Sequence, residues 1–241
     1  MSEREIIKQT LLSVLEDRGL SRLVTDSACE KLEYLYRELV KTNEQMNITA
    51  ITELSKVALL HFADSISCAG YIPEGARVVD IGCGGGFPCL PLAIARPDIK
   101  VLAIDSTAKK LTFVSRMAGE LGLSLETLAC RAEDASRTKE LRESFDLAVS
   151  RAVARMNVLS ELCLPFVRVG GSFIALKGRD ALAELEETQR GIKILGGVHR
   201  ESDLFTLPFE GGERGIIVCE KVSPTPERYP RAYAQIKKSP L

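Results

Sequence analysis

The chain has 241 residues, a formal net charge of −1 at pH 7 and an ordinary apolar content of 45%. This length suffices for one sizeable α/β domain with an extension of a few helices. The composition excludes a disordered chain, and no apolar run approaches the ~20 residues that a membrane-spanning helix needs. A near-neutral total does not exclude a nucleic-acid partner, because the distribution of the charge decides binding.

The N-terminal part of the chain predicts a helical extension. Residues 3–18 and 54–66 carry apolar side chains at helical spacing. Between them, a helix is predicted from about Ser27, where Glu30 stands three residues on in the pattern of a capping box. Proline and glycine at 73–75 then predict the boundary with the next domain.

Beyond this boundary the pattern alternates between strand and helix. Strands are predicted at 77–81, 99–104, 125–130, 145–149 and 171–176, and helices at 88–96, 108–121, 156–166 and 180–190. Residues 192–221 predict two more strands around two Gly-Gly pairs. Such alternation implies a parallel sheet with helices on both faces. The predicted fold class is therefore α/β: a doubly wound, mostly parallel, seven-stranded Rossmann-like sheet with an N-terminal helical extension.

The end of the chain is basic. Its charged side chains from residue 221 onward are Lys221, Glu227, Arg228, Arg231, Lys237 and Lys238. We therefore expect three parts: a helical extension at 1–75, a ligand-binding α/β domain at 76–222 and a basic tail at 223–241.

A glycine-rich loop follows the first predicted strand. It reads Asp-x-Gly-x-Gly-x-Gly, formed by Asp80, Gly82, Gly84 and Gly86. The dinucleotide-binding fingerprint fails in both registers, because Phe87 or Cys89 stands where its third glycine belongs, and there is no P-loop motif. The observed spacing is typical of methyltransferases that use S-adenosylmethionine, with a purely structural glycine-rich turn as the alternative.

In a doubly wound sheet, ligands bind beyond the carboxyl ends of the strands. The second predicted strand ends at Asp105, whose carboxylate can accept hydrogen bonds from both hydroxyls of a ribose. An acid is expected there for a nicotinamide as well as for a sulfonium ligand. The later strands end at 131–134, 150–151 and 177–178.

Several phrases resemble one family from about residue 40 to the end. They are residues 47–51, 61–65, 80–88, 105–110, 150–152, 175–178, 212–214, 229–231 and 240–241. On these phrases the chain resembles the RsmG family, formerly called glucose-inhibited division protein B, of small-subunit ribosomal RNA methyltransferases. It departs from the family pattern at Gly85, where a bulkier residue is common, and at Cys89, where glycine is usual.

The resemblance implies a methyltransferase-type sheet that uses S-adenosylmethionine to methylate N7 of a guanine in 16S (small-subunit) rRNA. It implies that the cofactor contacts Gly82, Phe87, Ala132, Glu133 and Arg151. The spacing of the glycine loop adds Gly84, and the end of the second predicted strand adds Asp105 for the ribose.

Guanine N7 has a free lone pair and no proton to remove, so positioning can suffice and we assign no catalytic residue. Cys89 is interpreted as a packing residue rather than a nucleophile. The candidate RNA contacts are Asn47, Lys177, Arg214 and Arg231. Solvated surface charge is the alternative for most single cations, and a turn-capping role is the alternative for Asn47. A histidine on the apolar face of a helix is more often a structural residue than a functional one, and this is the interpretation that we favour for His61.

The seven cysteines are odd in number and contain no Cys-x-x-Cys motif. This favours free thiols in a cytoplasmic protein over disulfides or a metal site. The N-terminus does not resemble a signal peptide. We expect rRNA or a small-subunit particle as partner, no membrane and a monomeric protein. Two other functions remain open: a non-catalytic rRNA-binding assembly factor, which keeps the fold as a scaffold, and a small-molecule methyltransferase, against which the basic tail argues.

Overall fold

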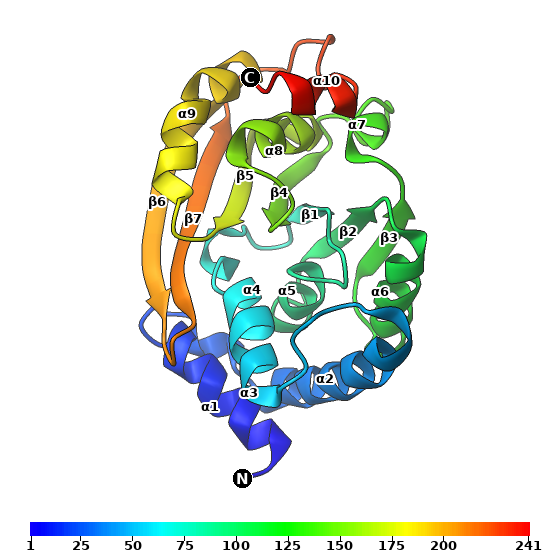
Figure 1. Ribbon diagram of the computed structural model, residues 1–241, viewed down its shortest axis with the longest axis vertical. Coiled ribbons are helices and arrows are strands. Elements are labelled where there is room, and N and C mark those ends of the chain that lie inside the picture. The colour runs from blue at the N-terminus through cyan, green and yellow to red at the C-terminus, as the bar shows by residue number, and fades with distance from the viewer.

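The computed structural model describes residues 1–241, and its centre is one seven-stranded sheet (Figure 1). The strands are β1 (Arg77–Ile81), β2 (Lys100–Asp105), β3 (Leu125–Ala129), β4 (Phe145–Arg151), β5 (Val167–Lys177), β6 (Gly197–Leu207) and β7 (Gly212–Lys221). They lie in the order β3-β2-β1-β4-β5-β7-β6, and only β7 runs antiparallel to its neighbours. The mostly parallel, seven-stranded sheet predicted from the sequence is confirmed.

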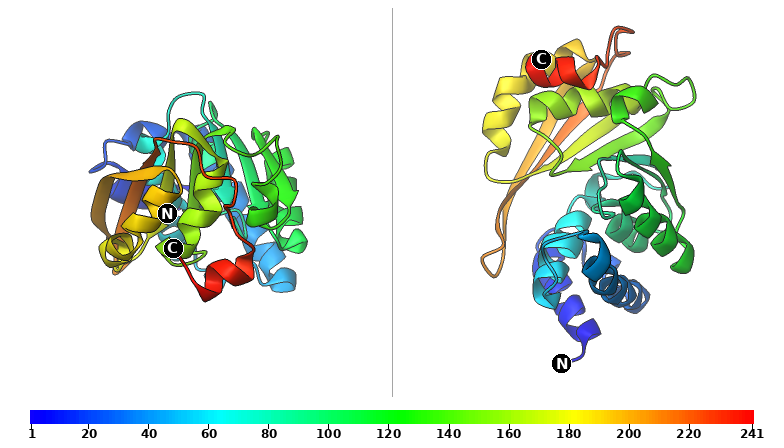
Figure 2. Two further views of the ribbon diagram at one scale, coloured as in Figure 1. Left: turned by 90° about the horizontal axis from the view of Figure 1, so that it is seen from above. Right: turned by 45° about the vertical axis from the view of Figure 1, so that its right-hand side comes forward.

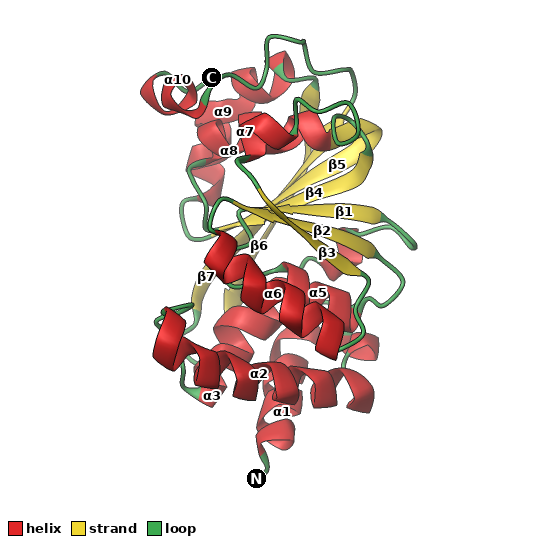
Figure 3. Cartoon of the chain, turned by 90° about the vertical axis from the view of Figure 1, so that its right-hand side faces the viewer, coloured by secondary structure: helices red, strands yellow, loops and turns green.

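Helices cover both faces of the sheet (Figure 3). They are α1 (Glu3–Leu15), α2 (Asp26–Met46), α3 (Leu54–Val57), α4 (Asp64–Ile66), α5 (Cys89–Ala95), α6 (Ala108–Glu120), α7 (Ala132–Ala135), α8 (Met156–Cys163), α9 (Ala181–Ile194) and α10 (Tyr233–Lys238). One face packs against α5 and α6, and the other packs against α8 and α9. After the exposed Arg77, every residue of strand β1 is buried, and all of these residues are apolar apart from Asp80, because both faces of the strand are covered.

The N-terminal helices form a further layer below α5 and α6 (Figure 3). Their apolar side chains join those of α5, α6 and one face of the sheet in a single hydrophobic cluster. Helix α2 begins one residue before the predicted Ser27, and the capping box with Glu30 is wrong. Thr25 is the N-cap, since its Oγ1 accepts a hydrogen bond from the amide of Ala28 at 3.1 Å.

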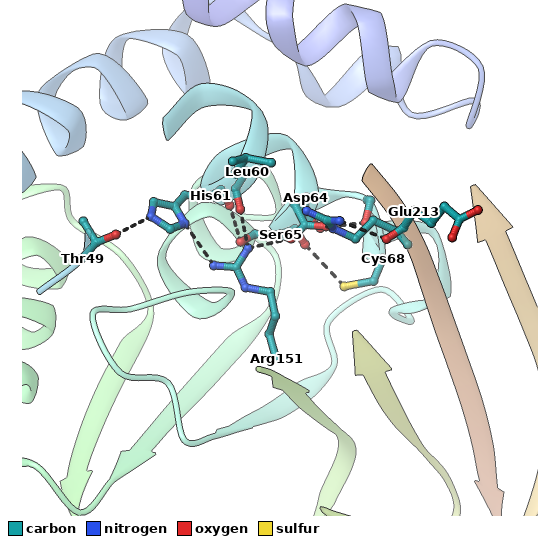
Figure 4. A network of polar contacts seen from close by, with 10 residues as sticks. Thr49, Leu60, His61, Asp64, Ser65, Cys68, Arg151 and Glu213 are labelled. Atoms are coloured by element: carbon teal, nitrogen blue, oxygen red, sulfur yellow. Dashed lines mark hydrogen bonds and ion pairs between the residues drawn. The ribbon is translucent and has the colours of Figure 1, made fainter. Parts of the chain in front are cut away.

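The third predicted helix is one continuous rod with a wide turn in its middle. A π-helical segment, η2 (Ala58–Ala63), connects α3 to α4. Such wider turns are rare in helices and frequent at functional sites. This one contains His61 and leads directly into Asp64, and both side chains take part in the polar network around Arg151 (Figure 4).

The β6–β7 hairpin extends past the sheet toward the N-terminal helices (Figure 2). Asp203 of β6 forms an ion pair with Arg18, which follows α1, and accepts a hydrogen bond from the hydroxyl of Tyr71 at 3.0 Å. The hairpin therefore ties the helical extension to the far edge of the sheet. None of the helices is both long enough and apolar enough to cross a membrane.

The basic tail is docked on the α8 side of the sheet rather than extended. Arg142 donates to the carbonyl oxygens of Thr225 (2.8 Å) and Tyr229 (3.0 Å). Arg231 forms a bidentate ion pair with the fully buried Glu161, with Nη2 to Oε2 at 2.6 Å. The tail ends in α10, which the sequence did not predict. The division of the chain into three parts, 1–75, 76–222 and 223–241, remains a prediction.

Candidate active site

A cavity of about 390 Å³ opens at the carboxyl ends of β1, β2, β3 and β4. All seven residues that the sequence singled out for a cofactor line it: Gly82, Gly84, Phe87, Asp105, Ala132, Glu133 and Arg151. Parallel strands bring these residues together, because the chain leaves every parallel strand at the same edge of the sheet.

The glycine loop bends sharply over the end of β2. The amides of Gly82 and Cys83 both donate to the carbonyl oxygen of Ile104, at 2.8 and 3.2 Å. Gly82 has a φ of +73°, and a Cβ there would lie 2.4 Å from a methyl group of Val153. Only glycine satisfies both conditions without displacing the loop.

Gly85 allows the N-terminal extension to approach the loop. A Cβ on this residue would lie 2.3 Å from a methyl group of Ile48, which also lines the cavity. The departure from the family pattern at this position thus makes room for the isoleucine side chain.

Asp105 holds two loops that frame the cavity. Its Oδ2 accepts a hydrogen bond from the amide of Gly84 at 2.9 Å, and its Oδ1 accepts one from the amide of Thr107 at 2.7 Å. A carboxylate oxygen has two lone pairs, so each oxygen keeps one for a ligand hydroxyl.

Asp80, the acid of the glycine motif, lies beneath the loop and does not line the cavity. It is fully buried, its Oδ2 accepts a hydrogen bond from the amide of Cys89 at 3.0 Å, and its Oδ1 has no partner. Burial raises the pKa of this carboxyl group to about 7.

Burial also raises the pKa of the Cys89 thiol well above its ordinary value. A protonated, buried thiol is a poor nucleophile, in agreement with the packing role predicted for Cys89.

Arg151 is the centre of a polar network that joins the third helix to the sheet (Figure 4). Its Nη1 donates to Asp64 Oδ2 at 2.9 Å and to the carbonyl oxygen of Leu60 at 2.8 Å. The other oxygen of Asp64 accepts a hydrogen bond from Nε of Arg214 at 3.0 Å. The buried Asp64 therefore holds two guanidinium groups, one from β4 and one from β7.

His61 extends the network to the glycine loop. Its ring stacks on Phe87 with the centroids 4.4 Å apart, and its Nε2 lies 2.8 Å from the hydroxyl of Thr49. Burial, and to a lesser degree the charge of Arg151, lower the pKa of His61 to about 4. The imidazole is therefore neutral at pH 7, and its ring packs against that of Phe87. This agrees with the structural role that the position of His61 on an apolar helix face favours.

A second cavity of about 380 Å³ adjoins the first at Arg151 and Ala152, which line both. Ala152 has a φ of +57°, a backbone conformation that is uncommon for a residue with a side chain and that clusters at functional sites. Lys177 and Arg214, two of the four predicted RNA contacts, line this second cavity.

The other two predicted RNA contacts lie outside both cavities. Asn47 is exposed and ends α2 in the left-handed conformation (φ +47°), next to Ile48 of the first cavity. Arg231 is held by Glu161, so its guanidinium is not free.

Sequence reasoning missed several residues of the site. Ile48, Val153 and Tyr233 line the first cavity, and Asp64 and Glu184 line the second. Val153 lies two residues beyond the end of β4, whereas the other four come from a connector, helices and the tail, where the rule that ligands bind at strand ends gives no signal. Of these five residues, only Ile48 and Asp64 fell within phrases on which the family resemblance was based.

The strand order, the glycine loop and the cavity together define a protein of the Rossmann-like methyltransferase class. A solved S-adenosylmethionine-dependent O-methyltransferase from Thermotoga maritima matches with a TM-score of 0.53 and 18% identity, over 78% of this chain and 72% of that one. A geranyl diphosphate methyltransferase solved with S-adenosylmethionine matches with a TM-score of 0.52 and 15% identity, over 66% of this chain and 85% of that one. At these identities the likeness concerns the fold alone.

The sequence comparisons identify the family. The model of the GidB family, rRNA small subunit methyltransferase G, matches residues 28–208. Ribosomal RNA small subunit methyltransferase G of Brevibacillus brevis is 46% identical over 97% of this chain and 99% of the relative. The protein of the same name from Geobacillus thermodenitrificans is 44% identical over 95% and 97%. The chain therefore belongs to the rRNA small subunit methyltransferase G family, as the sequence phrases predicted, and it is a methyltransferase.

Proposed function

We propose that this enzyme transfers a methyl group from S-adenosylmethionine to N7 of a guanine in small-subunit rRNA. The observation that carries the proposal is the pair of adjoining cavities, one framed by the glycine loop and one lined by cations, with Arg151 between them. The names of the relatives agree with the rRNA substrate.

The first cavity has the chemical features that S-adenosylmethionine requires. The glycine loop leaves open space beside Gly84, where an added Cβ would meet no atom within 4 Å. We propose that Asp105 accepts hydrogen bonds from the ribose hydroxyls and that Ala132 and Glu133 lie at the edge of the adenine. Gly82 and Phe87 would border the methionine portion, and Arg151 would lie where the two cavities meet.

The cofactor supplies a methyl group that is already activated by the positive sulfur. Guanine N7 has no proton to lose, so the protein needs to exclude water and to align the two reactants. Arg151 is suited to this task, because Asp64 and the carbonyl of Leu60 hold its guanidinium in one position. No side chain is required as a base, and the buried Cys89 is not required as a nucleophile.

N7 faces the major groove of paired RNA, which is too deep and narrow for side chains, so the target guanine must be unpaired or distorted. We propose that Lys177 and Arg214 contact the RNA at the second cavity and that Asn47 does so at the rim of the first. Arg231 is the fourth candidate contact: Glu161 binds its Nε and Nη2, so only Nη1, on a side chain that is 24% exposed, is left to contact RNA. We also propose that the enzyme acts as a monomer in the cytoplasm, on rRNA or on a small-subunit particle.

A map of N7-methylguanines in small-subunit rRNA, with and without this protein, tests the activity. We expect one guanine to lose its methyl group when the protein is absent. An unchanged map would contradict the proposal and favour the non-catalytic assembly factor. Methylation of small molecules but not of rRNA would favour the small-molecule enzyme.

The RNA contact at Arg214 has a test of its own. We expect Arg214→Ala to weaken binding of rRNA and to leave the affinity for S-adenosylmethionine, measured by calorimetry, nearly unchanged. Arg200→Ala serves as the control, since Arg200 pairs with Glu220 at the exposed surface of β6 and lines neither of the two cavities. Equal losses of RNA and cofactor affinity in Arg214→Ala would place this residue in the cofactor site instead.

A further inference from the structure

The second cavity contains a carboxylate that the proposed function does not use. Glu184 lies in the first turn of α9 and lines this cavity together with Lys177, Arg214 and Asp64. We propose that the cavity receives the target guanine, turned out of its RNA strand, and that Glu184 recognises the base by accepting a hydrogen bond from its exocyclic amino group N2. This inference rests on the proposed methylation of guanine and adds the residue that selects the base.

The two oxygens of Glu184 have different environments. Oε2 accepts a hydrogen bond from the amide of Met156 at 2.7 Å and lies 2.6 Å from Nζ of Lys177. Oε1 has no hydrogen-bond partner in the protein. The contacts of Oε2 hold the carboxylate at the wall of the cavity and compensate part of its charge, while Oε1 keeps its full capacity to accept hydrogen bonds.

The other carboxylate of this cavity is not free in the same way. Both oxygens of Asp64 are bound by guanidinium groups, Oδ1 by Arg214 and Oδ2 by Arg151. Its side chain is 7% exposed, compared with 16% for Glu184. Asp64 thus positions the two arginines, and Glu184 is the acid with an oxygen available to a ligand.

This asymmetry matches the chemistry of guanine. The Watson–Crick edge of guanine carries the donors N1–H and N2–H₂, whereas adenine has an acceptor at N1 and no amino group at position 2. Enzymes that modify a base outside its stack read this edge by hydrogen bonds. An ionised carboxylate accepts hydrogen bonds only, so it favours guanine and disfavours adenine.

The position of Glu184 also agrees with the position of the reacting atom. N2 and N7 lie at opposite ends of the purine. A guanine held through N2 at α9 therefore directs N7 away from this helix. Arg151 and Ala152 line both cavities, so the N7 end of the base can approach the cofactor cavity across them.

The experiment compares two RNAs and two enzymes. Small-subunit rRNA is assembled by ligation with either guanosine or inosine at the mapped position, since inosine lacks only the N2 amino group. The ratio of kcat/KM for the two RNAs is measured for the wild type and for Glu184→Gln. Any effect of inosine on the RNA itself is common to all enzymes and cancels in the comparison of ratios.

We expect the wild type to prefer guanosine by about tenfold to hundredfold, the range for a hydrogen bond to a charged group. In Glu184→Gln the preference should fall close to one, with unchanged affinity for S-adenosylmethionine. Glu187→Gln is the matched control, because Glu187 lies on the same helix, pairs with Arg155 at the surface and does not line the cavity. This variant should retain the preference of the wild type.

The two proposals fail in different ways. An active wild type whose preference for guanosine survives in Glu184→Gln would show that Glu184 only stabilises the start of α8, and would overturn this inference alone. An active wild type that methylates both RNAs equally would overturn it as well. A wild type that does not methylate the guanosine RNA would overturn the proposed function together with the inference.

Discussion

Asp80 provides a quantitative prediction, because its buried carboxyl group has only one of its oxygens satisfied. The group has no exposed surface, and Oδ1 has no hydrogen-bond partner. Burial raises its pKa from the ordinary 3.8 to about 7 in the folded protein. At ~1.36 kcal/mol for each pH unit, this difference corresponds to a destabilisation of roughly 4 kcal/mol when the carboxyl group is fully ionised.

The sign of the effect follows from proton linkage. Below pH 3.8 the carboxyl group is protonated in both the folded and the unfolded chain, so no penalty exists. Between pH 3.8 and about 7 the unfolded chain binds fewer protons than the folded one, and stability falls as the pH rises. Above pH 7 the penalty is constant. The variant Asp80→Asn has no proton to lose at this position and lacks this contribution.

We therefore expect Asp80→Asn to gain stability relative to the wild type by roughly 2 to 3 kcal/mol between pH 5 and pH 8. Urea unfolding at several pH values measures this difference, and taking the difference removes the contributions of other titrating groups such as His61. Asp98→Asn is the control, because hydrogen bonding from Arg96 lowers the pKa of Asp98 to about 2, outside this window. A stability difference for Asp80→Asn that is flat with pH, or that falls as the pH rises, would refute the reasoning.

Two further predictions concern the loop and the tail. Gly82 and Gly84 both have positive φ, so alanine at either costs about 1 kcal/mol of strain. Gly82→Ala also collides with a neighbouring methyl group at 2.4 Å, so it should lose more stability in urea than Gly84→Ala, and equal losses would contradict the steric argument. Arg231→Ala leaves the buried Glu161 without its cation and should cost about 3 kcal/mol. Protease should then cleave the C-terminal segment faster, whereas unchanged resistance would show that other contacts hold the tail.

Much of the fold can be predicted from local sequence patterns. Examples are the strand that ends at Ile81, the glycine loop that follows it, and the acid Asp105 at the end of the next strand. Alternation of strands and helices then implies a parallel sheet, and a parallel sheet brings the strand ends to one edge. For this reason local patterns predicted the seven strands together with Gly84 and Asp105. The family resemblance supplied the other five cofactor residues, and all seven line one cavity.

The tertiary structure decided what depends on contacts between distant segments. Asp64 lies 87 positions from Arg151 and 150 positions from Arg214 along the chain, and the three side chains still form one charge network. The periodicity of the sequence does not predict these contacts, since each of the three is an ordinary charged residue within its own element. The same holds for Glu184. Only the tertiary structure shows that Met156 and Lys177 contact its Oε2 and leave its Oε1 without a partner. Local sequence preferences thus determined the helices and strands and the edge of the sheet at which the strands end. Tertiary packing determined which side chains share a cavity.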